Sequence, residues 1–162
     1  MTQIIIDIET NGLKSIENVI SCISFLKDGV LITFVGENEK EILTKFWNQI
    51  EIGDVLIGYN SDDFDLPFII KRSIINIIKV KRVISLDLRK KVNSFFTSYN
   101  KLDSGKLDDW AKILGMNDKP ENGLKVIEYY ENKEWSKIKE HCEYDVLITE
   151  KLLERCKECN IL

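Results

Sequence analysis

The pattern of apolar and polar positions divides the chain into a strand-rich first third and a largely helical remainder. Apolar runs predict strands over residues 3–8, 19–26 and 30–35. The second and third runs are joined by residues 27–29, Lys-Asp-Gly, a sequence typical of a tight hairpin turn. We therefore expect an antiparallel hairpin early in the chain.

The remaining segments show the apolar spacing of helices, interrupted by two short apolar strands. The strands are expected at residues 54–58 and 82–86. Helices are expected at residues 38–50, 62–73, 87–96, 107–114, 124–130 and 136–158, with Ser61 as the N-cap of the second. This order predicts an α/β fold with a mixed central sheet of about five strands flanked by helices. Because no repeat or linker-like tract interrupts residues 1–162, a single domain is expected.

Composition places the chain among ordinary globular proteins, since 44% of its residues are hydrophobic and 31% are charged. No apolar run approaches the roughly 18 residues of a membrane span, and the N-terminus lacks the pattern of a signal peptide. We therefore expect a cytoplasmic protein that does not associate with membranes. Without an export signal, its four cysteines are expected to be free thiols. Cys156 and Cys159 have the spacing of zinc ligands, but only His141 and Cys142 could complete such a site.

The net charge of −4 conceals an uneven distribution along the sequence. Residues 71–101 contain nine basic residues and one acidic residue, a local balance of +8, which leaves −12 for the rest of the chain. A phosphate-binding face would give this asymmetry, and so would a solvated lysine-rich face. Aromatic side chains in the stretch could stack on bases, with core packing as the alternative. They are Phe95, Phe96 and Tyr99.

Two acids occupy an apolar strand in which an unpaired carboxylate is costly. Strand alternation places Ile5, Asp7 and Glu9 on one face. So apolar a run favours a buried central strand, where a bare carboxylate costs several kcal/mol. We therefore expect a positive group beside Asp7 and Glu9. An edge strand with a solvated face is the alternative.

Two further acids also lie at apolar positions. On the last helix, Asp145 follows His141 by one turn, on the apolar stripe that continues through Ile148 and Leu152. Asp65 is flanked by apolar residues at the start of a helix, where the helix should turn inward. For Asp145 alone, a cap or an ion pair with a lysine would explain the position equally well.

Converging carboxylates are suitable ligands for hard divalent cations. Mg²⁺ and Mn²⁺ prefer oxygen ligands, and two such ions can clamp the attacking and leaving oxygens of a phosphoryl displacement. Without cations, the carboxylates would repel one another and raise each other's pKa values. The sequence therefore indicates a site for two Mg²⁺ or Mn²⁺ ions, formed by Asp7, Glu9, Asp65 and Asp145.

Together these motifs resemble the DEDD, or DnaQ-like, superfamily of 3′-5′ exonucleases, which have a ribonuclease H-like fold. The matching motifs are Asp7-Ile8-Glu9-Thr10, Asn60 with Phe64-Asp65, and His141 with Asp145. Residues 106–115 are similar to the segment that precedes the last motif, so the resemblance extends over residues 4–153. It implies that Asp7 contacts both metals, that Glu9 and Asp145 complete the site, and that Asp65 holds a ligand or a metal-bound water.

The resemblance also implies hydrolysis of single-stranded DNA or RNA from the 3′ end, with release of 5′-mononucleotides. A structure-specific endonuclease on the same fold and a catalytically inert nucleic-acid-binding domain are the alternatives. Such a chain would act alone, as a homo-oligomer, or as a subunit beside a polymerase or helicase. The candidate substrate contacts are Thr10, Asn60, Phe64, Arg89 and Lys90.

His141 departs from the spacing of both branches of this family. One branch has tyrosine four residues before the final aspartate and the other has histidine five residues before it. Here His141 lies four residues before Asp145, and Glu140 takes the position of the other branch's histidine. Histidine has an ordinary pKa of about 6.5, which suits a group that orients or deprotonates water. We therefore expect His141 to be the catalytic base. A supporting role outside the reaction is the alternative.

Overall fold

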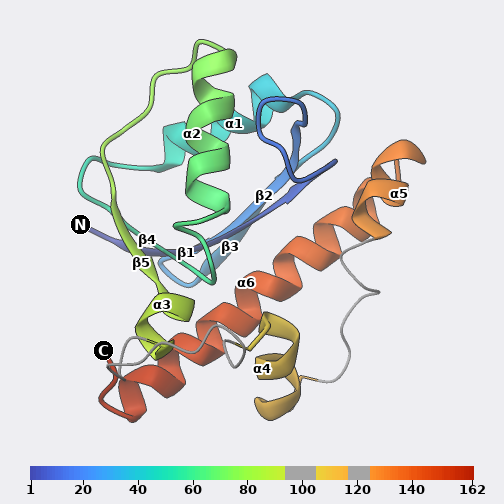
Figure 1. Ribbon diagram of the computed structural model, residues 1–162. Coiled ribbons are helices and arrows are strands. Elements are labelled where there is room, and N and C mark those ends of the chain that lie inside the picture. Colours follow the sequence, from blue (N-terminus) through green and yellow to red (C-terminus); the bar gives the residue numbers. More distant parts are fainter. Residues whose placement is uncertain (94–104, 117–124) are drawn as a thin grey trace.

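Five strands form one mixed sheet in the computed structural model, which describes residues 1–93, 105–116 and 125–162 (Figure 1). Their order is β3-β2-β1-β4-β5. β1 pairs antiparallel with β2 and parallel with β4, so the opening strand is central, as predicted. The strands are β1 (Gln3–Thr10), β2 (Ile20–Lys27), β3 (Val30–Val35), β4 (Val55–Gly58) and β5 (Ile84–Asp87).

A two-residue turn joins β2 to β3 and confirms the predicted hairpin. Lys27 pairs with Val30, and between them Asp28 and Gly29 have φ values of 51° and 75°. Positive φ at both central residues is the geometry that matches the twist of paired strands. Glycine and aspartate tolerate this conformation better than other residues do.

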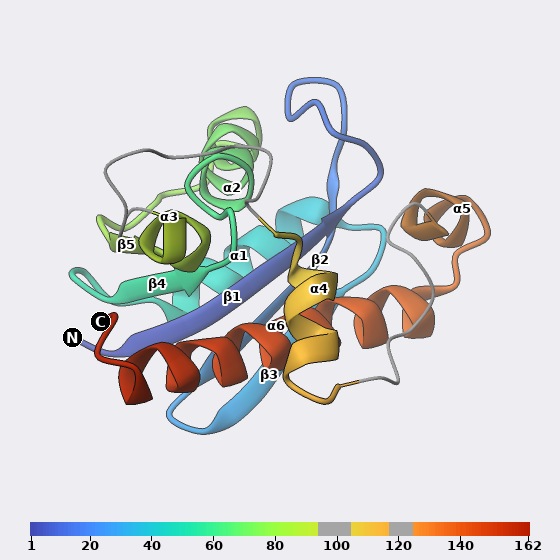
Figure 2. The same ribbon diagram turned by 60° about the horizontal axis from the view of Figure 1, so that its bottom comes forward.

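Helices cover both faces of the sheet (Figures 1 and 2). Ile4, Ile6 and Ile8 pack beneath α1 (Glu39–Gln49) and α2 (Asp65–Ile75), whereas Ile5 faces the long helix α6 (Trp135–Glu158). The predicted alternation along β1 is therefore confirmed. The remaining helices are α3 (Leu88–Asn93), α4 (Leu107–Ile113) and α5 (Lys125–Glu131). The predicted ends at residues 96 and 124 lie outside the described residues.

The start of α2 differs from the prediction. The helix begins at Asp65 rather than Asp62, and Phe64 rather than Ser61 is its N-cap. Before it the chain turns tightly, because Asn60 has φ 66° and its carbonyl accepts bonds from the backbone of Asp63 and Phe64. The Ser61 side chain caps nothing; its buried hydroxyl has no hydrogen-bond partner among the residues that the structure describes.

The cysteines and the helix lengths bear on two predictions made from composition. All four cysteines are free thiols, as predicted, and no cysteine belongs to a metal-binding group within the described part of the chain. Within the same residues, no helix is both long enough and apolar enough to cross a membrane.

Ile77, just after α2, has a conformation that favours glycine. Its φ is 57° and it is 91% exposed. Its backbone N–H donates to the Ile74 carbonyl at the end of the helix. A branched side chain is strained there. We expect Ile77→Gly to raise the free energy of unfolding by about 1 kcal/mol and the Tm by about 2–4 °C. Val80→Gly is the control, because Val80 is also exposed but does not have a positive φ. Equal effects of the two substitutions on thermal unfolding would contradict the strain.

Candidate active site

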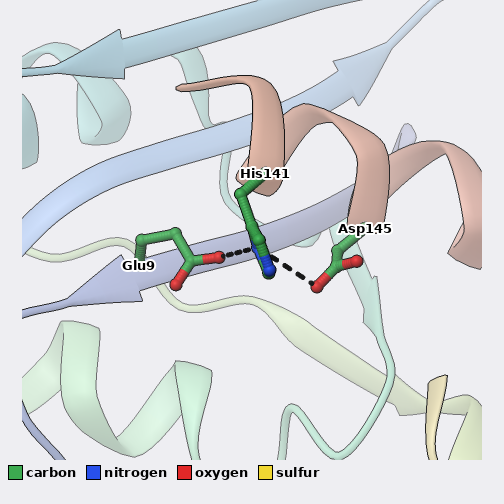
Figure 3. A group of neighbouring side chains, drawn as sticks. All are labelled: Glu9, His141 and Asp145. Atoms are coloured by element: carbon green, nitrogen blue, oxygen red, sulfur yellow. Dashed lines mark hydrogen bonds and ion pairs between the residues drawn. The ribbon is translucent and has the colours of Figure 1, made fainter. Parts of the chain in front are cut away.

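Strand β1 and helix α6 bring three of the predicted residues together. Figure 3 shows the His141 ring between the carboxylates of Glu9 and Asp145. His141 Nδ1 lies 2.6 Å from Glu9 Oε1 and 3.7 Å from Asp145 Oδ2. His141 is buried, although Glu140 beside it is exposed. The position four residues before Asp145 is therefore the one that faces the acids.

Asp7 and Asp65 lie next to this group. The Ile8 backbone N–H, between Asp7 and Glu9 in β1, donates to Asp65 Oδ1 over 3.2 Å. The Asp7 carbonyl accepts a bond of 3.3 Å from Cys142 Sγ on α6. Side chains of α2 and α6 thus bond to the backbone of β1 and fix the segment that carries both acids.

All of these acids line one cleft of about 350 Å³. The four predicted carboxylates and His141 come from β1, α2 and α6, which are distant in sequence. The other residues that line the cleft are Ile8, Tyr59, Asn60, Phe64, Lys106, Leu107 and Asp108.

Crowding of the acids is visible in their pKa values. Burial raises the pKa of Asp7 well above its usual range, and the charges of Asp145, Asp65 and Glu9 raise it further. Burial also raises the pKa of Asp65 to about 7, although bonds from backbone N–H groups oppose this and the charge of Glu9 adds to it. Repulsion of this kind is what a bound cation relieves.

The donor set fits a divalent cation. Asp7 Oδ2 is buried and has no hydrogen-bond partner among the described residues. Glu9, His141 and Asp145 each offer a ligand atom, and these atoms lie within 4.8 Å of one another. Carboxylate oxygens favour Mg²⁺ or Mn²⁺, and an imidazole nitrogen is also acceptable to Zn²⁺.

The predicted substrate contacts do not all reach the cleft. Asn60 and Phe64 line it, and Arg89 Nη1 donates to Asn60 Oδ1 over 2.7 Å. Thr10 is buried, and its hydroxyl donates to the Gly12 carbonyl. Lys90 is exposed and pairs with Asp62 and Asp63, outside the cleft.

The basic stretch is only partly available to a phosphate. Arg72, counted in its charge, is buried in an ion pair with Glu39. Phe95, Phe96, Tyr99 and Lys101 lie outside the described residues.

Sequence reasoning missed Asp87, which positions the turn that leads to Asp65. Its buried carboxylate at the end of β5 accepts bonds of 3.0 and 3.1 Å from the backbone N–H groups of Asn60 and Asp62. A signal was present: parallel strands end at the same edge, and Asp87 pairs with Gly58.

Lys106 and Asp108 were also missed, although their segment was included in the resemblance. The Tyr59 hydroxyl accepts a bond from Trp110 Nε1 and donates to the Gly105 carbonyl, both over 3.1 Å. These bonds hold the start of α4 against the cleft.

Comparison with known proteins identifies the family. The family model of the RNase H superfamily matches residues 4–157. The chain belongs to this superfamily. An uncharacterized protein of Methanocaldococcus jannaschii is 32% identical to this RNase H superfamily protein over 178 residues, covering 100% of this chain and 99% of that one.

Solved structures that share the fold include exonuclease I of E. coli. E. coli exonuclease I in complex with an oligonucleotide has a TM-score of 0.71 and 14% identity, over 96% of this chain and 41% of that one. The zinc-bound form of its complex with single-stranded DNA has a TM-score of 0.64 and 11% identity, over 99% and 41%. Brucella melitensis NrnC with bound Mg²⁺ has a TM-score of 0.54 and 14% identity, over 98% and 75%. This RNase H superfamily protein thus spans about two-fifths of the exonuclease I chains, and the predicted fold is confirmed.

The raised pKa values predict how metal-free stability changes with pH. A carboxyl whose pKa is higher in the folded state holds its proton more tightly there, so it favours folding at low pH and this contribution is lost as pH rises. For Asp65 the loss falls between its usual pKa of 3.8 and about 7. We expect the Tm of the metal-free protein to fall as the pH rises from about 4 to about 7. Mn²⁺ should raise the Tm more at the higher pH. A Tm that Mn²⁺ leaves unchanged at both pH values would contradict the cation site.

Proposed function

We propose that this protein is a metal-dependent 3′-5′ exonuclease that hydrolyses phosphodiester bonds of single-stranded DNA or RNA to 5′-mononucleotides. The observation that carries the proposal is the convergence of Asp7, Glu9, Asp65, Asp145 and His141 on one cleft. E. coli exonuclease I, among the proteins of similar fold, supports it. The direction of attack and the products come from the resemblance to DEDD exonucleases.

The four carboxylates would hold two Mg²⁺ or Mn²⁺ ions. Bound there, such ions would polarise the phosphate and stabilise the charge that develops on its oxygens. Asp7 is central to this role because it lies in the middle of β1 and interacts electrostatically with the other three acids. A fold that buries these acids together would otherwise be destabilised by their repulsion.

His141 is the candidate base. A neutral imidazole that donates from Nδ1 to Glu9 Oε1 has its lone pair on Nε2. Nε2 is therefore the atom that would accept a proton from the attacking water. Glu9 fixes the ring orientation and stabilises the imidazolium that forms.

A labelled-strand experiment tests the proposal. Matched single-stranded DNA and RNA oligonucleotides, labelled at the 5′ end, are incubated with the protein and Mn²⁺, with EDTA as the control. We expect a ladder that shortens from the 3′ end, and no cleavage in EDTA. The same strands labelled at the 3′ end should release labelled mononucleotide first.

Other outcomes would replace the proposal with one of the alternatives. Discrete internal products, with no ladder, would show an endonuclease. Retention of the strand in a gel shift without cleavage would show a binding domain. The ratio of the rates on DNA and RNA identifies the preferred strand.

A further inference from the structure

Next to Glu9 the pairing of β1 and β2 contains a bulge. Glu9 pairs with Cys22, but Thr10 pairs with Ile20, so Ser21 is an extra residue on β2. Ser21 Oγ donates to the Glu9 carbonyl over 3.1 Å. Bulges bend a strand and re-aim the neighbouring side chains. The direction of the Glu9 carboxylate therefore depends on how this bulge is held.

Glu39, the first residue of α1, holds the bulge from the opposite face of the sheet. Its Oε1 accepts a bond of 2.8 Å from the backbone N–H of Ile20. Its Oε2 accepts a bond of 2.8 Å from Asn76 Nδ2. Glu39 is only 7% exposed, so its charge needs a buried partner.

Arg72 on α2 supplies that partner and also contacts the loop after β1. Its Nε and Nη2 donate to Glu39 over 2.9 and 2.7 Å, which is a two-point contact. Its Nη1 lies 3.3 and 3.5 Å from the carbonyls of Ser15 and Ile16. One buried ion pair thus joins α1, α2, the bulge in β2 and the loop between β1 and β2.

We infer that Glu39 and Arg72 are positioning residues for Glu9. The pair fixes the bulge at Ile20 and the loop at residues 15–16. The bulge lies in the strand beside the end of β1, and the loop follows that end along the chain, so both restrain the segment that carries Glu9. This inference rests on the proposed function, because it assigns the pair a role in placing a ligand of the cation site. Without the pair the sheet can persist, while the end of β1 loses its fixed register beside His141.

Two substitutions and a stability control test the inference. Glu39→Gln keeps the side-chain shape but removes its charge, and Arg72→Lys keeps the positive charge but loses the forked contact. Ile50→Ala is the control, because Ile50 is fully buried at the C-terminal end of α1, whereas Glu39 is the first residue of that helix. Mn²⁺ affinity is measured from the EPR signal of free Mn²⁺, and kcat and KM are measured on a single-stranded oligonucleotide. All measurements are made at a temperature where circular dichroism shows each protein folded.

We expect both positioning variants to lose Mn²⁺ affinity and kcat by about 10- to 100-fold, with KM nearly unchanged. Ile50→Ala should lower the Tm but retain Mn²⁺ affinity and kcat. Wild-type affinity and kcat in the folded variants, or equal losses in Ile50→Ala, would overturn the inference. If Glu39→Gln does not fold, the Mn²⁺ affinity and kcat of Arg72→Lys test the inference. A wild-type protein that binds Mn²⁺ but cleaves no strand would contradict the nuclease, whereas the Mn²⁺ affinities of the variants would still test the positioning.

Discussion

Asp7→Asn is expected to abolish Mn²⁺-dependent cleavage, with a fall in kcat of about 10³-fold or more. The substitution preserves the shape of the side chain and removes the charge that lies among Glu9, Asp65 and Asp145. The same change should stabilise the metal-free protein at about pH 8, because it removes a buried charge that burial and three acids disfavour. We therefore expect the metal-free variant to have a higher Tm than the metal-free wild type. Loss of activity together with a gain in stability is typical of functional sites that carry unfavourable charge.

Asp63→Asn is the matched control for Asp7→Asn. Asp63 is an exposed acid in the turn that leads to α2, and it pairs with Lys90 outside the cleft. Its substitution should leave kcat unchanged and should not raise the Tm. Thermal unfolding in EDTA and a rate assay on one oligonucleotide measure both quantities. If Asp7→Asn retained kcat, the carboxylate cluster would not be the active site.

The sequence was sufficient to predict which side chains share a face, because that depends on local periodicity. Alternation in β1 placed Ile5 and Asp7 opposite Ile4 and Ile6, and the cores on the two faces of the sheet confirm it. The spacing of His141 and Asp145 on α6 likewise predicted one helix face, and the two side chains lie side by side. Periods of 2 and 3.6 residues survive in the folded protein because the backbone geometry of a strand or a helix fixes which side chains point the same way.

Contacts between distant polar residues were not predictable in this way. Arg72 was counted with a basic stretch, but 33 positions separate it from Glu39, and nothing local indicates that the two are paired. For Asp87 the end of a predicted strand was a signal, but its partners, the backbone N–H groups of another loop, were not indicated. The start of α2 was misplaced for a related reason: the positive φ of Asn60 and the bonds that the backbone of Asn60 and Asp62 donates to Asp87 favour a turn over an early helix. Such networks depend on three-dimensional proximity, which local pattern does not encode.

His141→Ala is expected to lower kcat by about 10²–10⁴-fold, the contribution typical of a general base. Oxygen ligands remain after this change, since Asp7, Glu9 and Asp145 are intact, so Mn²⁺ affinity and KM should change little. Removal of the buried ring also leaves a space beside Glu9, and added imidazole should restore part of the rate. Rates with and without imidazole, together with Mn²⁺ affinity from EPR, measure the effect.

Glu140→Ala is the matched control for His141→Ala, and it separates the two spacings found in DEDD exonucleases. Glu140 has the position of the histidine in one branch, but it is exposed, whereas His141 is buried between Glu9 and Asp145. The control should therefore keep wild-type kcat. Wild-type turnover in His141→Ala would remove the histidine from the reaction. A large loss of Mn²⁺ affinity in that variant would instead show that His141 binds the metal, because a base that acts on water contributes to the rate and not to cation binding.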